Sequence, residues 1–362
     1  MLENKSLETS NFYSPRFEVE IDNQTLKAEM SKTILDVSVV ETINEGGSFE
    51  LTVHDEFDLT TQEFKWLDHP LFNVGNTIMI KMGYGNKLHD MLMGKITSLK
   101  PSFFSGETPT LIVIGHDLSY DYFKKITPEE QFVDMKYSDI VQSIASDARL
   151  KSVVDKTEKY EETITKKNNE TYYVFLEKLA NIIGYQFKIV KNTLYFTKYE
   201  DDSDAILTLE LGKDIISFSP SLKTTGLITE VEVRGHNPQD PGKPIVGTAR
   251  AGDERSQESG KKTGSQVAEE HYGTVKKVIS NTNVNSEEQA TKMAQSILSK
   301  ASDGLIEGNV KCIGIPEIRA GVNVMIEKVG QRFSGKYYVK SATHTINNSG
   351  YLTSFSVKRN AL

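Results

Sequence analysis

The sequence is short of cysteine and of long apolar runs, and each shortage excludes a class of protein. Cys312 is the only cysteine, so no disulfide can form within the chain. No window approaches the 18 consecutive apolar residues of a transmembrane helix, and residues 1–17 lack the apolar core of a secretory signal. These features predict a protein made and kept reduced in the cytoplasm, with no membrane insertion of its own.

Positive charge is also scarce. The formal net charge is −8, whereas a protein that binds nucleic-acid phosphates usually presents a basic surface. We therefore expect no sequence-specific nucleic-acid partner. Hydrophobic residues make up 38% and charged residues 25% of the 362 residues, a balance typical of globular domains and sufficient for two or three of them.

Motifs that carry chemistry are missing as well. None of the seven histidines forms HExxH, and one cysteine cannot supply a CxxC pair, so no zinc site of ordinary spacing is present. Two runs place carboxylates beside a histidine, at residues 54–56 and 269–271, and we interpret both as solvated charge. The sequence also lacks a GxSxG elbow and a P-loop, and residues 82–86 are interpreted as a hairpin turn.

The prediction is therefore a protein that is not an enzyme, with no catalytic residues, no cofactor-binding residues, no cofactor and no metal ligands. A glycosidase-type pair of carboxylates stays open, because acidic residues are plentiful and none is marked out by its neighbours.

What the sequence does contain is a β-rich segment that is present twice. Strands are expected at Val322–Ile326, Tyr337–Ala342 and Tyr351–Val357, each preceded by a turn that contains glycine. Residues 74–117 show a similar order. Gly75 aligns with Gly321 at an offset of 246, Gly94-Lys95 with Gly335-Lys336 at 241, and Ser105-Gly106 with Ser349-Gly350 at 244. The pattern indicates a duplicated β unit, although short β meanders can also resemble one another by chance.

The remaining patterns divide the chain into three domains. Residues 1–118 are expected to form a β-rich domain of six or seven strands that closes a small barrel, with a short helix at Phe57–Leu67. Residues 119–205 are expected to be a small α+β domain. It has one helix capped by Ser138, a solvated loop with one short strand at Lys151–Asn169, a helix that ends at Gly184, and a hairpin.

Residues 206–362 are expected to form the second β domain, with strands at residues 206–211, 215–219 and 228–233. An insertion of a loop and a helix is placed at about residues 236–307. Its first part, Pro238–Thr274, is nearly free of large apolar residues and is predicted to be a structureless loop. Its second part begins with the capping box Ser286-Glu287-Glu288-Gln289 and continues as an amphipathic helix.

The closing segment resembles a known family. The strings AGVNVMI, GQRFSGKYYVKSATHTI and SGYLTSFSVKRN are similar to the end of the late control protein D family, the baseplate hub of contractile phage tails. The hub part of type VI secretion spike proteins and the hubs of extracellular contractile injection systems are similar too. Earlier strings match in order: GKITSLKPSF, LIVIGHDLSYDYFKK, SDIVQSIASDARL, YYVFLEKLANIIGYQFKI and ITEVEVRGHNP.

This resemblance implies a fold and a function. The implied fold is α+β and β-rich, with two tail-tube-like β-barrels in one chain, a small α+β middle domain and an insertion in the second barrel. The implied protein is a homotrimer whose six barrels adapt the hexameric tail tube to a trimeric spike, as a component of a virion or injection particle. The tail tube protein, a separate spike protein and other baseplate subunits are its implied partners.

An alternative remains open from the sequence. It is a β-rich, tail-associated cell-wall hydrolase or carbohydrate-binding module, which assembly state and activity on peptidoglycan would separate from a hub.

Overall fold

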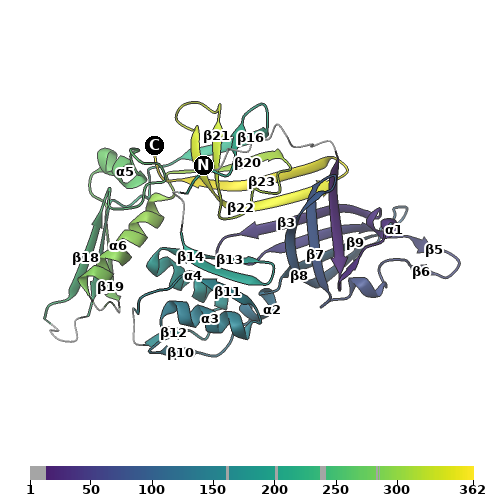
Figure 1. Ribbon diagram of the computed structural model, residues 1–362, viewed down its shortest axis with the longest axis horizontal. Helices are drawn as coiled ribbons and strands as arrows, with labels where there is room; N and C mark the ends of the chain where they lie inside the picture. Colours follow the sequence, from purple (N-terminus) through teal and green to yellow (C-terminus); the bar gives the residue numbers. More distant parts are fainter. Residues whose placement is uncertain (1–13, 160–162, 200–202, 237–241, 283, 285) are drawn as a thin grey trace.

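The computed structural model describes residues 14–362, except 160–162, 200–202, 237–241, 283 and 285 (Figure 1). Its dominant element is a 13-stranded sheet, which consists of two units. No helix among the described residues is long and apolar enough to cross a bilayer.

The first unit of the sheet comes from the N-terminal third of the chain. Its strands are hydrogen-bonded in the order β1-β7-β8-β9-β4-β3, and short β2 (Gln24–Thr25) and α1 (Ala28–Ser31) follow β1 in the sequence. The strand bounds are β1 (Pro15–Ile21), β3 (Ile34–Thr42), β4 (Ser48–His54), β7 (Thr77–Tyr84), β8 (Lys87–Ser102) and β9 (Thr110–Asp117).

The second unit repeats this order with later strands. Its hydrogen-bonded path is β15-β21-β22-β23-β20-β16. Each strand takes the place of its counterpart in the first unit, although β15 runs parallel to β21 whereas β1 is antiparallel to β7. The bounds are β15 (Thr208–Glu210), β16 (Ile215–Leu222), β20 (Ile306–Ile313), β21 (Asn323–Glu327), β22 (Gly335–Asn347) and β23 (Gly350–Arg359).

Two of the irregularities in the ladders of the large sheet recur at matching places. The β3–β4 ladder shifts register between Ile34 and Asp36, and the β16–β20 ladder shifts between Ile215 and Ser217. In the same way, β8–β9 shifts between Ile96 and Ser98, and β22–β23 between Val339 and Ser341. Bulges bend strands at defined positions, so their recurrence fixes the residue-by-residue correspondence of the two units.

The glycine turns before β7 and β21 agree with that correspondence. Gly75 and Gly321 have φ of +97° and +86°, a region that side chains rarely adopt. Gly75 N donates to Ile96 O at 2.8 Å, and Gly321 N donates to Val339 O at 2.9 Å. The expected alignment of Gly94-Lys95 with Gly335-Lys336 is wrong by two residues. Gly94 is opposite Ile78 on β7, and its counterpart Tyr337 is opposite Val324 on β21.

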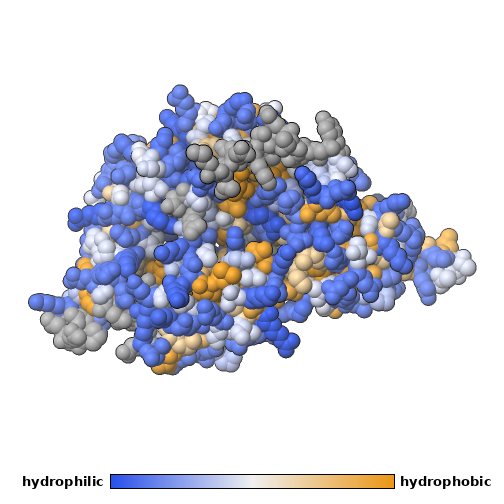
Figure 2. Space-filling view, viewed as in Figure 1, coloured by the Kyte–Doolittle hydropathy of each residue, from blue (hydrophilic) through white to orange (hydrophobic). Residues whose placement is uncertain are grey.

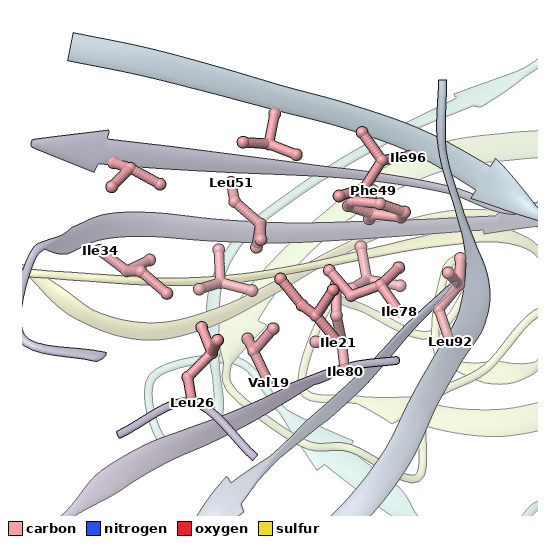
Figure 3. Packing of buried hydrophobic residues seen from close by; sticks show 14 of the residues in the cluster. Val19, Ile21, Leu26, Ile34, Phe49, Leu51, Ile78, Ile80, Leu92 and Ile96 are labelled. Atoms are coloured by element: carbon pink, nitrogen blue, oxygen red, sulfur yellow. The ribbon is translucent and has the colours of Figure 1, made fainter. Parts of the chain in front are cut away.

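Each unit of the sheet has its own hydrophobic core. In the first, alternate apolar residues of the strands point inward, among them Ile21, Leu51, Ile78 and Ile80 (Figure 3). Both cores contain a glycine that receives an aromatic ring from a neighbouring strand. A Cβ on Gly115 would lie 2.2 Å from the Phe49 ring, and one on Gly308 would lie 2.8 Å from the Phe218 ring. The aromatic ring that packs on the glycine therefore comes from β4 in the first core and from β16 in the second, which are not counterparts in the repeat.

Strand β22 joins the two units. Its first residues pair with β21, and its second half pairs with β3, from Ser341 opposite Thr42 to Asn347 opposite Asp36. The long β22–β23 ribbon therefore extends from the second unit onto the first (Figure 1). Within the described ranges no ladder joins β1 to β3, so the hydrogen bonds form one continuous sheet across both units.

The middle segment packs a separate core under two small sheets. The expected hairpin and the helix ending at Gly184 (φ +69°) are confirmed, whereas the first helix begins after Lys136 and is not capped by Ser138. The loop expected at Lys151–Asn169 contains two strands, β11 and β12. The elements are α2 (Tyr120–Phe123), β10 (Glu130–Val133), α3 (Tyr137–Asp147), β11 (Lys151–Val154), β12 (Thr163–Lys166), α4 (Tyr172–Ile183), β13 (Tyr185–Val190) and β14 (Thr193–Lys198).

The inserted segment is more structured than expected. Pro238–Thr274 was predicted to be a loop, and beyond residues 237–241, which lie outside the described ranges, that prediction is wrong. Ile245, Gly247 and Ala249 alternate inward, and Thr263 and Gln266 form a capping box. The elements are β17 (Glu230–Gly235), β18 (Ile245–Arg250), α5 (Gly264–Tyr272), β19 (Lys276–Thr282) and α6 (Glu287–Ser302), which begins after the expected Ser286 cap.

Strand β17 also differs from expectation in its partners. Residues 228–233 were assigned to the second β domain, but β17 pairs with β18 and β19 in a three-stranded sheet covered by α6. Its apolar residues bury against the alanines of that helix, so the insertion starts near Glu230.

The prediction of a short helix at Phe57–Leu67 is wrong. The segment forms a small hairpin of β5 (Phe57–Asp58) and β6 (Glu63–Phe64), followed by η2 (Pro70–Phe72). Asp58 accepts a hydrogen bond from Thr60 N at 2.7 Å and turns the chain, and the Phe57 and Phe64 rings then meet at 4.8 Å. The hairpin projects from the end of the first unit (Figure 1).

A buried histidine lies where the two units meet. His344 on β22 is fully buried, its Nε2 lies 2.9 Å from Ile318 O, and its Nδ1 lies 3.0 Å from the Tyr351 hydroxyl. Burial, aided by the nearby Arg319 guanidinium, lowers the pKa of His344 from 6.5 to about 3. The imidazole is therefore neutral in the folded protein at neutral pH.

We expect this histidine to make the fold sensitive to acid. The unfolded chain binds a proton at His344 that the folded chain does not, so the contribution is complete above pH 6.5 and is lost as pH falls toward 3. Between pH 7 and pH 5 the loss should be about 2 kcal/mol. Urea unfolding of the wild type and of His344→Gln at both pH values measures it. Equal pH dependence in the two proteins would contradict the assignment.

Candidate functional site

The described residues contain no cluster that suggests chemistry. No group of three His, Cys, Asp or Glu side chains in the described ranges is arranged to hold a metal ion. In the run 54–56, the Asp55 carboxylate accepts hydrogen bonds from the backbone N–H groups of Glu56, Trp66 and Leu67 at 2.8–2.9 Å. It therefore organises the β5–β6 hairpin and does not pair with His54.

The second acidic run lies on the exposed side of α5. Glu269, Glu270 and His271 are exposed, Glu270 pairs with Lys262 at 2.6 Å, and His271 contacts the neighbouring Tyr272 ring. The interpretation as solvated charge therefore holds for residues 269–271, but it is wrong for Asp55 in the first run, which is buried. The candidate site is therefore a set of surfaces and joints, and its central feature is the contact between the two sheet units.

Arg319 is the polar centre of that contact. It lies in the segment between β20 and β21, and its guanidinium binds both carboxylate oxygens of Glu41 on β3. It also donates to Asp90 O at 3.0 Å and to Met91 O at 2.6 Å on β8. The Arg319 and Glu41 side chains are only 21% and 14% exposed. One side chain thus ties the second unit to two strands of the first.

The neighbours of Arg319 extend the same contact. The Tyr84 hydroxyl donates to Gly314 O at 2.8 Å, and the Tyr84 ring packs against Tyr351 at 5.5 Å. His89 and Glu317 lie 3.7 Å apart at its rim. The segment between β20 and β21 therefore rests on the β7–β8 hairpin, which gives the two units a fixed relative orientation. Neither Arg319 nor Glu41 was predicted as a functional residue from the sequence. The one local signal is that Glu41 places a charge at the end of the apolar run of β3.

A second buried polar joint holds the middle segment to the first unit. The Asp117 carboxylate accepts from Gly47 N and from Ser119 N, and the Ser119 hydroxyl lies 2.7 Å from the Tyr173 hydroxyl on α4. Burial raises the pKa of Asp117, and its hydrogen bonds oppose that shift. Asn44 adds two backbone-directed hydrogen bonds to Phe187 on β13.

The edges of the large sheet that have no ladder partner within the described ranges include those of β16 and of the second half of β8. Strand β16 pairs only with β20. Strand β8 pairs with β7 as far as Lys95 and with β9 throughout its second half, so its far side is uncovered from Thr97 to Ser102. Each of these two edges contains a proline, Pro220 or Pro101, a residue that a ladder tolerates where its nitrogen faces outward.

Exposed apolar side chains gather beside one of these edges. Phe103 and Phe104 follow β8 and are 54% and 67% exposed, and the Phe103 ring meets Phe64 of the small hairpin at 5.2 Å. Leu59 at the hairpin tip is 84% exposed. Hydrophobic colour at this end of the molecule marks the tip (Figure 2). Contiguous exposed apolar groups of this kind often mark interaction surfaces.

The fold is that of phage tail proteins. The 43 kDa tail protein of prophage MuSo2 from Shewanella oneidensis matches with a TM-score of 0.71 and 16% identity, over 96% of this chain and 98% of that one. A tail protein from Neisseria meningitidis matches with a TM-score of 0.70 and 12% identity, over 96% and 97%. An Escherichia coli component of the type VI secretion system, described as structurally similar to T4 tail proteins gp27 and gp5, matches with a TM-score of 0.59 and 9% identity, over 96% and 77%.

These likenesses agree with the resemblance to baseplate hubs found in the sequence. No curated protein sequence matches the chain. A family model, the Alg8 N-terminal domain, matches residues 13–348, which make up most of this chain. The chain therefore belongs to the Alg8 N-terminal domain family.

Proposed function

We propose that the chain is a structural baseplate hub of a contractile tail or injection particle. The observation that carries this proposal is the repeated strand order, with bulges at matching positions, in the two units of the sheet. Similarity to tail proteins along nearly the whole chain supports it. The division into a first barrel (1–118), a middle domain (119–205) and a second barrel with an insertion (206–362) belongs to this proposal.

The duplicated unit gives the hub its mechanism. A ring in which each unit contacts the next head to tail closes on itself when the rotation per unit divides a full turn. Three chains with two tail-tube-like barrels each supply six similar units, so a homotrimer can stack on a hexameric tail tube. The same trimer offers threefold symmetry to a separate spike protein. Other baseplate subunits would bind around it, and the action is assembly without catalysis.

Such an adaptor needs a rigid joint within each chain. Arg319 and its partners Glu41, Asp90 and Met91 supply it, because they fix the second unit on two strands of the first. A hinge at this place would let the two units of one chain leave the ring plane. The proposal therefore connects the buried ion pair to function through geometry.

We expect Arg319→Ala to lower the free energy of unfolding by about 3 kcal/mol, because it leaves the largely buried Glu41 carboxylate unpaired. The double variant Glu41→Leu/Arg319→Met should recover most of that loss, since it removes both charges. Urea unfolding followed by Trp66 fluorescence measures both. Lys292→Ala, which removes two exposed ion pairs, is the matched control and should change nothing measurable. An unchanged midpoint for Arg319→Ala would contradict a structural role for the joint.

We also expect the purified full chain to have three times its 40.6 kDa mass by light scattering, and to bind rings of its tail tube protein. Mass measurement at several tens of micromolar, with and without the tube protein, tests both points. A monomer that clears a peptidoglycan suspension would instead support the hydrolase alternative.

A further inference from the structure

We infer that the uncovered edge of β16 in one copy pairs with the uncovered half of β8 in the next copy, as an antiparallel ladder in a defined register. The inference rests on the proposed trimeric hub and specifies the contact between its subunits. Its occupant is a second copy of this chain, because the chain already contains one example of the same contact.

That example is the ladder between β22 and β3. The second half of β22 leaves its own unit after Val339 and pairs with β3, from Ser341 opposite Thr42 to Asn347 opposite Asp36. In the repeated order, β8 takes the place of β22 and β16 takes the place of β3. The chain therefore presents both halves of a second, similar ladder, but at opposite ends of the sheet, where they cannot meet within one chain.

The bulges define the expected register. They match Ser98 of β8 with Ser341 of β22, and Ser217 of β16 with Asp36 of β3. When each residue pair of the β22–β3 ladder is replaced by its counterparts, Leu99 lies opposite Leu222, and Lys100 lies opposite Ser221. Further along, Ser102 comes opposite Ser219, and Phe103 opposite Phe218.

The side chains suit this pairing. The internal pair Ile346–Val37, which Phe103 and Phe218 would reproduce, is buried in the first core. Phe103 is 54% exposed in the single chain, and Ile216 at the start of β16 is 55% exposed. A second copy would cover apolar groups on both edges at once, and alternating serines on β16 leave room for a neighbour.

The two prolines fall at one step of the inferred ladder. Pro101 takes the place of His344 and Pro220 the place of Val39, which are opposite each other in the internal ladder. Lys223 N donates to Leu305 O, so alternation along β16 turns the Pro220 nitrogen away from β20. This step has no N–H donors, so the backbone hydrogen bonds of the inferred ladder fall to the pairs two residues away on either side, Leu99–Leu222 and Phe103–Phe218. Prolines of this kind also protect a free edge from promiscuous pairing before assembly.

Cysteine pairing tests the register directly. Lys100 and Ser221 are exposed in the single chain and would form a non-hydrogen-bonded pair, in which Cα atoms lie close enough for a disulfide. The variant Lys100→Cys/Ser221→Cys, oxidised as the full chain, should give a covalent species of three subunits on a non-reducing denaturing gel. Reduction should return it to single chains. The native Cys312 is buried and should not take part.

Matched variants control for chance collisions. Lys100→Cys/Ser217→Cys places the second cysteine four residues away on the same face of β16, about 13 Å along the strand, and should not link subunits. Val40→Cys/Thr343→Cys occupies the matching pair inside the chain, so it should form a disulfide without change of mass.

The outcomes separate this inference from the proposed function. A threefold mass without the 100–221 disulfide, or with equally efficient linkage at 100–217, would overturn the register and leave the trimeric hub standing. A monomeric mass at every concentration, alone and with the tube protein, would overturn the trimer and this inference together. A reducible, three-subunit species specific to 100–221 supports both.

Discussion

The structure depends on one constraint, which is that β22 is longer than the unit to which it belongs. Its first residues complete the second unit through β21, and its last seven pair with β3 of the first unit. Backbone hydrogen bonds thus connect two otherwise separate hydrophobic cores. Because a one-residue slip would turn every side chain of β22 to the other face, the buried His344 and Ile346 also set the orientation of the units.

Much of the fold could be predicted from local patterns. Glycines with positive φ mark the start of β7 and β21, and apolar alternation marks the strands that follow, so the repeat was visible before its structure. The helix that ends at Gly184 was equally clear. These features depend on residues close together in the sequence, and the side chains alone specify them.

Other features could not be predicted because distant contacts decide them. Phe57 and Phe64 have no clean period and suggested a helix, but Phe103 from the end of β8 holds them as a hairpin. The sequence of β17 predicts a strand but not its partners, because its packing against the alanines of α6 determines which sheet it joins. The Arg319–Glu41 pair joins residues 278 apart. Nothing in either local sequence identifies the other member as its partner.

The ladder inferred between copies shares the geometry of the internal β22–β3 ladder but differs from it in chemistry. In the internal ladder, Glu41 and His344 lie on the paired strands and add a buried ion pair and a buried imidazole. The matching positions at the free edges are Leu222 and Pro101. Burying an ion pair costs desolvation, which a covalently tethered joint meets once during folding, whereas separate subunits would meet it at each association. Apolar and proline residues avoid that cost, and the edge residues are therefore those expected where one copy must find another in solution.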